Sequence, residues 1–227
     1  IQTFAMRHRA ALLERGLLVP TLEPHLPQHS QPHHVLAHTV AGQRTVLDRA
    51  RIPDLVAQWH ETAAARGAAV LISAEPIYRH VLKEAPDESW ADGRRRYLKR
   101  LARLLAPFEI EPVLVFRRPE DFARSSFQER VMKSSSFPWG SFAEFRDRAV
   151  DIRKYFRNAT MLQAVFGNLT VMTFEDLMET GSVTRGFFGA LGIDVSDLDD
   201  GGVVRESLGP RQTAVKLALI RRGYPPK

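Results

Sequence analysis

Three short apolar runs, separated by segments with helical patterning, constrain the fold of this chain most strongly. The runs are 68–73, 110–116 and 169–174, and each is short enough to form a strand buried on both faces. Strands that alternate with helices indicate β–α–β units and therefore a parallel sheet. We predict an α/β fold, a three-layer sandwich with a central parallel sheet.

Helical patterning accounts for most of the chain outside these runs. Apolar residues recur at helical spacing, often with a proline in the first turn or a glycine after the last. The predicted helices cover 1–15, 35–40, 53–66, 76–83, 88–107, 119–133, 142–148, 152–166, 175–179, 184–191 and 210–222. The sequence shows no internal repeat and no linker, so we predict that residues 1–227 form a single domain.

The composition is that of an ordinary globular chain, with 44% hydrophobic and 26% charged residues. Cysteine is absent, which excludes disulfides, thiolate metal sites and a cysteine nucleophile. No apolar run is long enough to span a bilayer, and no signal peptide is visible. We therefore expect no integral membrane contact and a cytoplasmic location.

The basic character of the chain is local. The formal net charge is +6, and residues 94–103 hold six lysines and arginines without an acid. The rest of the chain is balanced, so we expect no nucleic-acid partner. We favour a solvated helix face as the interpretation of this basic segment, with contact to an anionic acceptor as the alternative.

A candidate anion site lies after the second apolar run, because ligands of open parallel sheets bind outside the carboxyl ends of the strands. The run 110–116 is followed by Arg117, and Ser125 lies eight residues further on in the next predicted helix. A guanidinium and a hydroxyl placed in this way could hold one phosphate. Alternatively, Arg117 pairs with Glu120 or Asp121 at the helix start, and spacing alone favours this simpler interpretation.

The stretch from Arg117 to Phe127 resembles the 3′-phosphate-binding segment of sulfotransferases that use 3′-phosphoadenosine 5′-phosphosulfate (PAPS). In that family a strand ends in an arginine and a serine follows eight residues later, and Arg117 and Ser125 match these two positions. Looser similarity to bacterial members extends over 1–20, 34–37, 71–75 and 155–175. The resemblance implies a P-loop-type fold, PAPS as cofactor, and transfer of a sulfuryl group to a hydroxyl or amine of a carbohydrate or small-molecule acceptor, with no metal ion.

The sequence departs from this family at the phosphate loop. The family's loop contains glycine, lysine and threonine, holds the 5′-phosphosulfate and precedes the first helix, and no such motif occurs in 1–227. The chain begins within a helical pattern, so we expect the loop and the first strand to lie upstream of Ile1. Two alternatives stay open: a non-catalytic nucleotide- or ligand-binding protein of the same fold, and a nucleotide kinase-like P-loop enzyme.

Glu75 is the candidate catalytic base. It closely follows the apolar run 68–73, where a carboxylate could take a proton from the acceptor. Some sulfotransferases of this fold use a glutamate near this point, and others use a histidine. The alternative is an ion pair between Glu75 and Arg79, one helical turn later.

Five histidines lie close together in a segment that is rich in proline and glutamine. They are His25, His29, His33, His34 and His38. No acidic or cysteine partner lies nearby, so we predict no metal site. One of them, with His33, His34 and His38 as the candidates, could replace Glu75 as the base.

Overall fold

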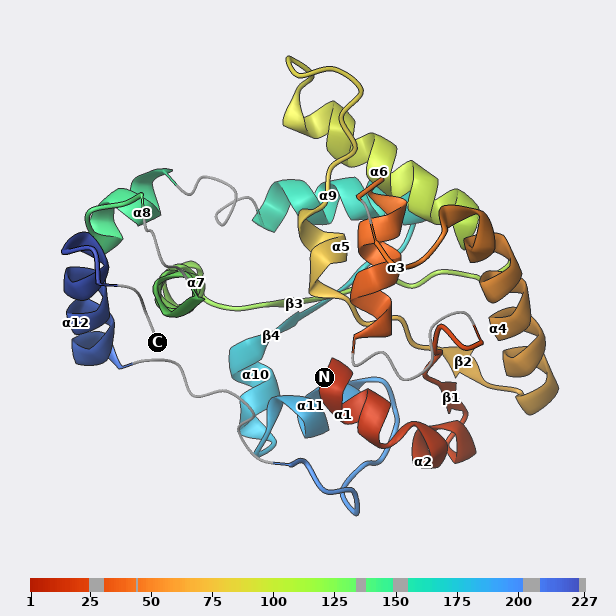
Figure 1. Cartoon of the computed structure of the whole chain (residues 1–227). Helices are drawn as coiled ribbons and strands as arrows, with labels where there is room; N and C mark the ends of the chain where they lie inside the picture. Colours follow the sequence, from red (N-terminus) through yellow and green to blue (C-terminus); the bar gives the residue numbers. More distant parts are fainter. Residues whose placement is uncertain (25–30, 44, 134–137, 149–154, 202–208, 225–227) are drawn as a thin grey trace.

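The computed structural model describes residues 1–24, 31–43, 45–133, 138–148, 155–201 and 209–224 (Figure 1). The helices are α1 (Gln2–Arg7), α2 (Arg9–Glu14), α3 (Pro32–Val40), η1 (Arg49–Arg51), α4 (Ile52–Arg66), α5 (Glu75–Arg79), α6 (Trp90–Leu104), α7 (Pro119–Lys133), α8 (Phe142–Arg148), α9 (Tyr155–Phe166), α10 (Phe174–Glu179), α11 (Val183–Ala190) and α12 (Pro210–Arg221). The strands are β1 (Leu17–Leu18), β2 (Ala69–Val70), β3 (Val113–Phe116) and β4 (Thr170–Thr173).

The strands form two parallel pairs. β1 pairs with β2, and β3 pairs with β4 over four residues, from Val113 opposite Thr170 to Phe116 opposite Thr173. A mixed α/β fold with parallel strands is therefore confirmed. In the described part of the chain, however, the backbone ladders do not join the two pairs into the single central sheet that we predicted.

A histidine side chain ends the β1–β2 pair early. His33 of α3 accepts a hydrogen bond from the backbone N–H of Ser73 at 3.1 Å, and its other ring nitrogen lies 3.0 Å from the carbonyl oxygen of Pro20. These backbone groups lie just beyond β2 and β1, so they bond to the imidazole and not to a neighbouring strand. The apolar run 68–73 consequently contains a strand of only two residues.

Neighbouring residues in the strands and directly after β2 point into two different hydrophobic clusters. Leu18, Ile72 and Leu114 pack into a cluster that contains side chains of α3, α4, α6 and α9. The residues next to them belong to a second cluster with α1, α2, α10 and α11; they are Leu17, Leu71, Val113 and Val115. Strands of both pairs thus have the same two groups of helices on their two sides, and Figure 1 shows α6 and α9 on one side of β3 and β4 and α10 and α11 on the other.

Helices α7, α8 and α12 form a third, smaller cluster beside this core. Its buried residues are Phe127, Val131, Phe145 and Leu217. Figure 1 shows this group projecting to the left, with α7 following directly after β3. None of the helices that the structure describes is both long enough and apolar enough to cross a membrane.

Candidate functional site

The paired ends of β3 and β4 carry the arginine that the sequence singled out. Phe116 and Thr173 are the last residues in register, so Arg117 and Phe174 leave the sheet side by side. The guanidinium carbon of Arg117 lies 4.9 Å from the centroid of the Phe174 ring. The Nε atom of Arg117 is buried and has no hydrogen-bond partner among the described residues. A buried, unsatisfied N–H of a cation is costly, and an anion would remove that cost.

The ion pair that we considered for Arg117 does not form. No ion pair between described residues joins Arg117 to Glu120 or Asp121. Ser125 lies in the second turn of α7 and is half-buried. No hydrogen bond joins Ser125 to Arg117 in the described part of the chain, so their joint role in binding a phosphate stays a prediction.

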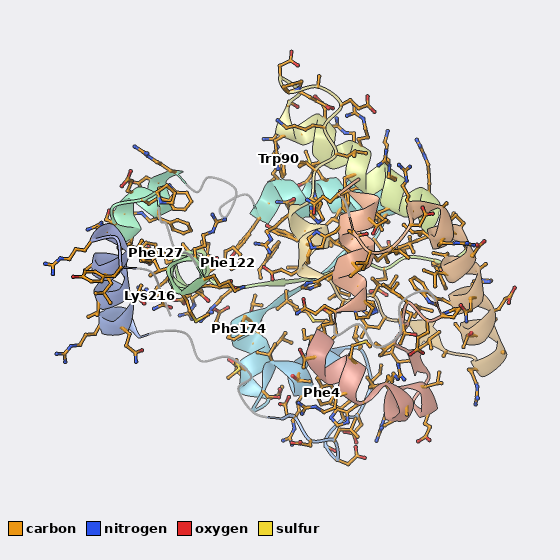
Figure 2. All side chains as sticks on the ribbon, viewed as in Figure 1. Phe4, Trp90, Phe122, Phe127, Phe174 and Lys216 are labelled. Carbon is orange, nitrogen blue, oxygen red and sulfur yellow. The ribbon has the colours of Figure 1, made fainter. Side chains whose placement is uncertain are left out.

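Aromatic rings from three helices surround the end of β3. Tyr155 of α9 stacks on Phe116, with ring centroids 4.4 Å apart. The rings of Tyr78 of α5 and Phe116 meet edge-on, with centroids 6.3 Å apart. The ring centroid of Phe122 of α7 lies 5.9 Å from that of Tyr155. Figure 2 shows Phe122 and Phe174 close to this end of the strand. The rings bring α5, α7 and α9 together beside Arg117.

Tyr155 has an electrostatic environment that holds it in the neutral phenol form. Burial, Tyr78 and the charge of Glu175 raise the pKa of Tyr155 to about 12, and Arg117 opposes the rise. Its hydroxyl is buried without a hydrogen-bond partner among the described residues. The Glu175 carboxylate accepts a hydrogen bond of 3.2 Å from the backbone N–H of Arg118. A neutral phenol, a cation and a carboxylate therefore lie together at the ends of β3 and β4.

Glu75 is the first residue of α5 and forms the ion pair that was the alternative to a catalytic role. Its carboxylate lies 3.2 Å from the guanidinium of Arg79, and both side chains are more than half exposed. Glu75 precedes Tyr78 by about one helical turn, and Tyr78 contacts Phe116. The helix that carries Glu75 thus lies beside the candidate anion site, while the role of Glu75 as base stays a prediction.

His33, one of the three histidine candidates for the base, is buried, and both of its ring nitrogens lie within hydrogen-bond distance of backbone groups. Its side chain is 1% exposed. Since Nδ1 accepts from the N–H of Ser73, Nε2 carries the proton and donates it to the carbonyl of Pro20. Burial lowers the pKa of His33, so the neutral ring that these hydrogen bonds require is also the favoured one.

His38 forms a hydrogen-bonded pair with His80, a residue that the sequence did not single out. Nδ1 of His38 lies 2.8 Å from Nε2 of His80. Burial, together with His38, Arg79 and Arg94, lowers the pKa of His80 to about 4. One of the two rings donates the shared hydrogen bond and the other accepts it.

The remaining histidines of the cluster do not form a metal site in the described part of the chain. His34 is partly exposed, and burial lowers its pKa while the charge of nearby Glu75 opposes that shift. Within the described ranges, no group of three or more histidines, aspartates and glutamates could hold a metal ion. His25 and His29 lie outside the described residues.

Arg94 of α6 departs from the predicted solvated basic face, because it is fully buried. Its Nη1 donates to the carbonyl oxygens of Ile77 at 2.5 Å and His80 at 2.8 Å, at the carboxyl end of α5. Its Nε and Nη2 atoms are buried and have no hydrogen-bond partner among the described residues. Burial lowers the pKa of Arg94 to about 10, so the side chain is still a cation at pH 7.

Helical spacing contains the signal for this buried arginine. Arg94 precedes Tyr97, Leu98 and Leu101 by three, four and seven residues, and all four are buried on one face of α6. A count of charges does not distinguish Arg94 from the neighbouring Arg95, although Arg95 is exposed and forms an ion pair with Asp92. Periodicity, and not composition, separates the buried arginine from its exposed neighbours.

Comparison of the chain with family models, with curated proteins and with solved structures gives no match. The resemblance to PAPS-dependent sulfotransferases therefore rests on the residues of the sequence itself.

Proposed function

We propose that this protein is a sulfotransferase that transfers a sulfuryl group from PAPS to a hydroxyl or amine of a carbohydrate or small-molecule acceptor. The observation that carries the proposal is Arg117, a half-buried cation that follows a parallel strand and whose buried Nε has no hydrogen-bond partner among the described residues. Its position before α7, eight residues from Ser125, is the pattern on which the resemblance rests. A cation with an open N–H at a strand end suits the 3′-phosphate of the cofactor.

We also infer that the two strand pairs belong to one central parallel sheet of a three-layer sandwich. Leu18 of β1 and Leu114 of β3 share one hydrophobic cluster, and Leu17 and Val113 share the other. One sheet between two layers of helices accounts for this alternation in both pairs. The ends of β3 and β4 would then lie at the edge of the sheet where ligands of such folds bind.

The roles of the residues follow from these positions. Arg117 and Ser125 hold the 3′-phosphate of PAPS, which supplies the activated sulfuryl group. Glu75, at the start of the neighbouring α5, takes the proton from the attacking hydroxyl or amine. Its ion pair with Arg79 is exposed and contributes little to stability, so the carboxylate can leave that partner when the acceptor binds.

Nucleotide binding by the full chain tests the proposal. We expect 3′-phosphoadenosine 5′-phosphate to bind more tightly than 5′-AMP in calorimetry, because only the former carries the 3′-phosphate. Arg117→Ala removes a charge-assisted contact worth about 1.5–3 kcal/mol, which corresponds to a tenfold to hundredfold loss of affinity. The same substitution should leave the affinity for 5′-AMP nearly unchanged.

Arg118→Ala is the matched control. Arg118 is exposed, and it contacts Glu175 through its backbone N–H, which the substitution keeps. We expect Arg118→Ala to bind 3′-phosphoadenosine 5′-phosphate almost as the unmodified protein does. Equal affinities for the two nucleotides, or equal small effects of both substitutions, would refute a 3′-phosphate site at Arg117.

A further inference from the structure

Arg94 has a hydrogen-bonding edge in the interior of the protein that is unpaired among the described residues. A guanidinium is planar, and its Nε–H and one N–H of Nη2 point in the same direction. These are the two nitrogens of Arg94 that are buried without a partner among the described residues, while Nη1 is anchored on two backbone carbonyls. This edge is the one that binds carboxylates, sulfates and phosphates through two parallel hydrogen bonds.

Within the ranges that the structure describes, no ion pair joins a carboxylate to this side chain. Of the acids that lie nearest in the sequence, Asp92 pairs with Arg95 at 2.9 Å. Glu84 and Glu88 both pair with Arg96, at 3.1 and 2.6 Å. Each of these acids is therefore used by a more exposed arginine. A fully buried cation without a counter-ion is unfavourable, and a bound anion would supply the missing charge.

The groups around this edge of Arg94 are neutral. Tyr97 lies under the guanidinium, whose carbon is 5.5 Å from the ring centroid, and burial raises its pKa further above neutrality. Burial also raises the pKa of Tyr78, against the opposing effects of a side-chain hydrogen bond with Asn158 and of the charge of Arg94. A neutral phenol is a hydrogen-bond donor, so Tyr78 can add a third donor to an anion at this position.

We propose that Arg94, with Tyr78 beside it, is a binding site for the oxyanion group of a small molecule, a carboxylate, sulfate or phosphate. Tyr78 connects this site to the candidate nucleotide site, because its ring also contacts Phe116 at the end of β3. The Arg94 site uses side chains of α5 and α6 and none of the residues assigned to the 3′-phosphate. It therefore does not depend on the proposed function of Arg117.

Anion titrations of the full chain at low ionic strength test this site. Acetate, sulfate and phosphate are added separately, with chloride at matched ionic strength as reference. We expect at least one of the three oxyanions to raise the unfolding temperature with saturation. In Arg117→Ala, which lacks the other candidate anion site, it should bind with a stoichiometry of one per chain in calorimetry. The same oxyanion should shift a buried arginine Nε–H resonance that is still present in NMR spectra of ¹⁵N-labelled Arg117→Ala.

Substitutions locate the binding. Arg94→Leu should lower the affinity for the oxyanion at least tenfold. Arg94→Lys should lower it nearly as much, because an ammonium lacks the two parallel N–H groups. The matched control is Arg95→Leu, on the same helix but exposed, which should bind as the unmodified protein does. Arg117→Ala should also leave this binding unchanged, which separates the result from the test of the nucleotide site.

The proposal is overturned by either of two results. One is that none of the three oxyanions gives a saturable effect beyond that of chloride in the unmodified protein, a result that needs no variant. The other is that Arg94→Lys or Arg94→Leu keeps the affinity. If neither Arg94 variant folds, the Nε–H titration of Arg117→Ala decides, because an unmoved resonance excludes the site.

Discussion

At the scale of single residues, the structure separates two kinds of buried polar group. His33 has both ring nitrogens bonded to backbone groups, so it completes the fold and needs nothing further. Arg94 and Arg117 each have buried nitrogens without a partner among the described residues. Satisfied groups stabilise the folded chain, whereas unsatisfied cations cost free energy until an anion binds. The second kind therefore identifies the places where ligands are expected.

His33 can be tested for its structural role by truncation. His33→Ala leaves the N–H of Ser73 and the carbonyl of Pro20 without their partner and creates a cavity. We expect a loss of about 2–4 kcal/mol in the free energy of unfolding, measured by urea denaturation. His60→Ala is the control, because His60 is exposed and only meets the edge of Phe108; its effect should stay below about 1 kcal/mol. Equal effects of the two substitutions would contradict the role assigned to His33.

At the scale of elements, helical periodicity predicted the helices well and the sheet less well. The prediction for 142–148 coincides with α8, and that for 119–133 with α7. The helix predicted over 1–15 is divided at His8, where the side chain contacts the backbone carbonyl of Asp199. Such contacts between distant segments leave no periodic signal. The same reason hides the bond from His33 to Ser73, which ends the β1–β2 pair, and the pairing of His38 with His80.

In the candidate site, too, the sequence predicted the positions that depend on local pattern and not those that depend on contacts between distant segments. The sequence placed Arg117 at a strand end and Ser125 in the next helix, because both positions depend on local pattern. The aromatic surroundings of Arg117 come from other parts of the chain, with Tyr78 on α5 and Tyr155 on α9. Only the fold brings these rings together, so no spacing rule could have predicted them.

The packing of α10 on α11 depends on a glycine. A Cβ atom at Gly186 would lie 2.5 Å from the carbonyl oxygen of Leu177 and 2.7 Å from its Cα, which are backbone atoms that cannot move aside cheaply. We expect Gly186→Ala to lower the free energy of unfolding by about 1–3 kcal/mol. Gly189 lies in the same helix with nothing near its Cβ position, so Gly189→Ala should stabilise by about 0.5–1 kcal/mol. Thermal unfolding measures the stability of both variants. If both substitutions stabilised the protein, or both destabilised it, the result would contradict this packing.

At the scale of the whole molecule, the strands divide the core into two hydrophobic clusters, and the two candidate sites lie at the end of β3 and at the end of the neighbouring helix α5. Arg117 follows β3, while Arg94 reaches the carboxyl end of α5 from α6. α5 belongs to both places, because Tyr78 contacts Phe116 and interacts electrostatically with Arg94. Occupation of either site would therefore restrain α5, and through it the His38–His80 pair.

The buried His33 and the half-buried His80 make the stability of the molecule depend on pH. Burial lowers the pKa of His33, and burial with nearby His38, Arg79 and Arg94 lowers the pKa of His80 to about 4. In the unfolded chain both histidines titrate near pH 6.5. Between these values the unfolded state binds more protons than the folded state, so the free energy of unfolding falls as the pH falls from about 6.5 toward 4.

The contribution of His80 can be isolated by substitution. The contribution of His80 to the free energy of unfolding is fully present well above pH 6.5. Because His80 is partly exposed, we expect this contribution to be smaller at pH 4.5 by an amount on the order of 1–2 kcal/mol. His80→Asn removes the titrating group, so urea denaturation between pH 7 and 4.5 should give a shallower decline for this variant than for the unmodified protein. His60→Asn, at an exposed position, should keep the original slope. An unchanged slope in His80→Asn would mean that the folded state does not hold His80 neutral, and the His38–His80 hydrogen bond would then have to persist with a protonated ring.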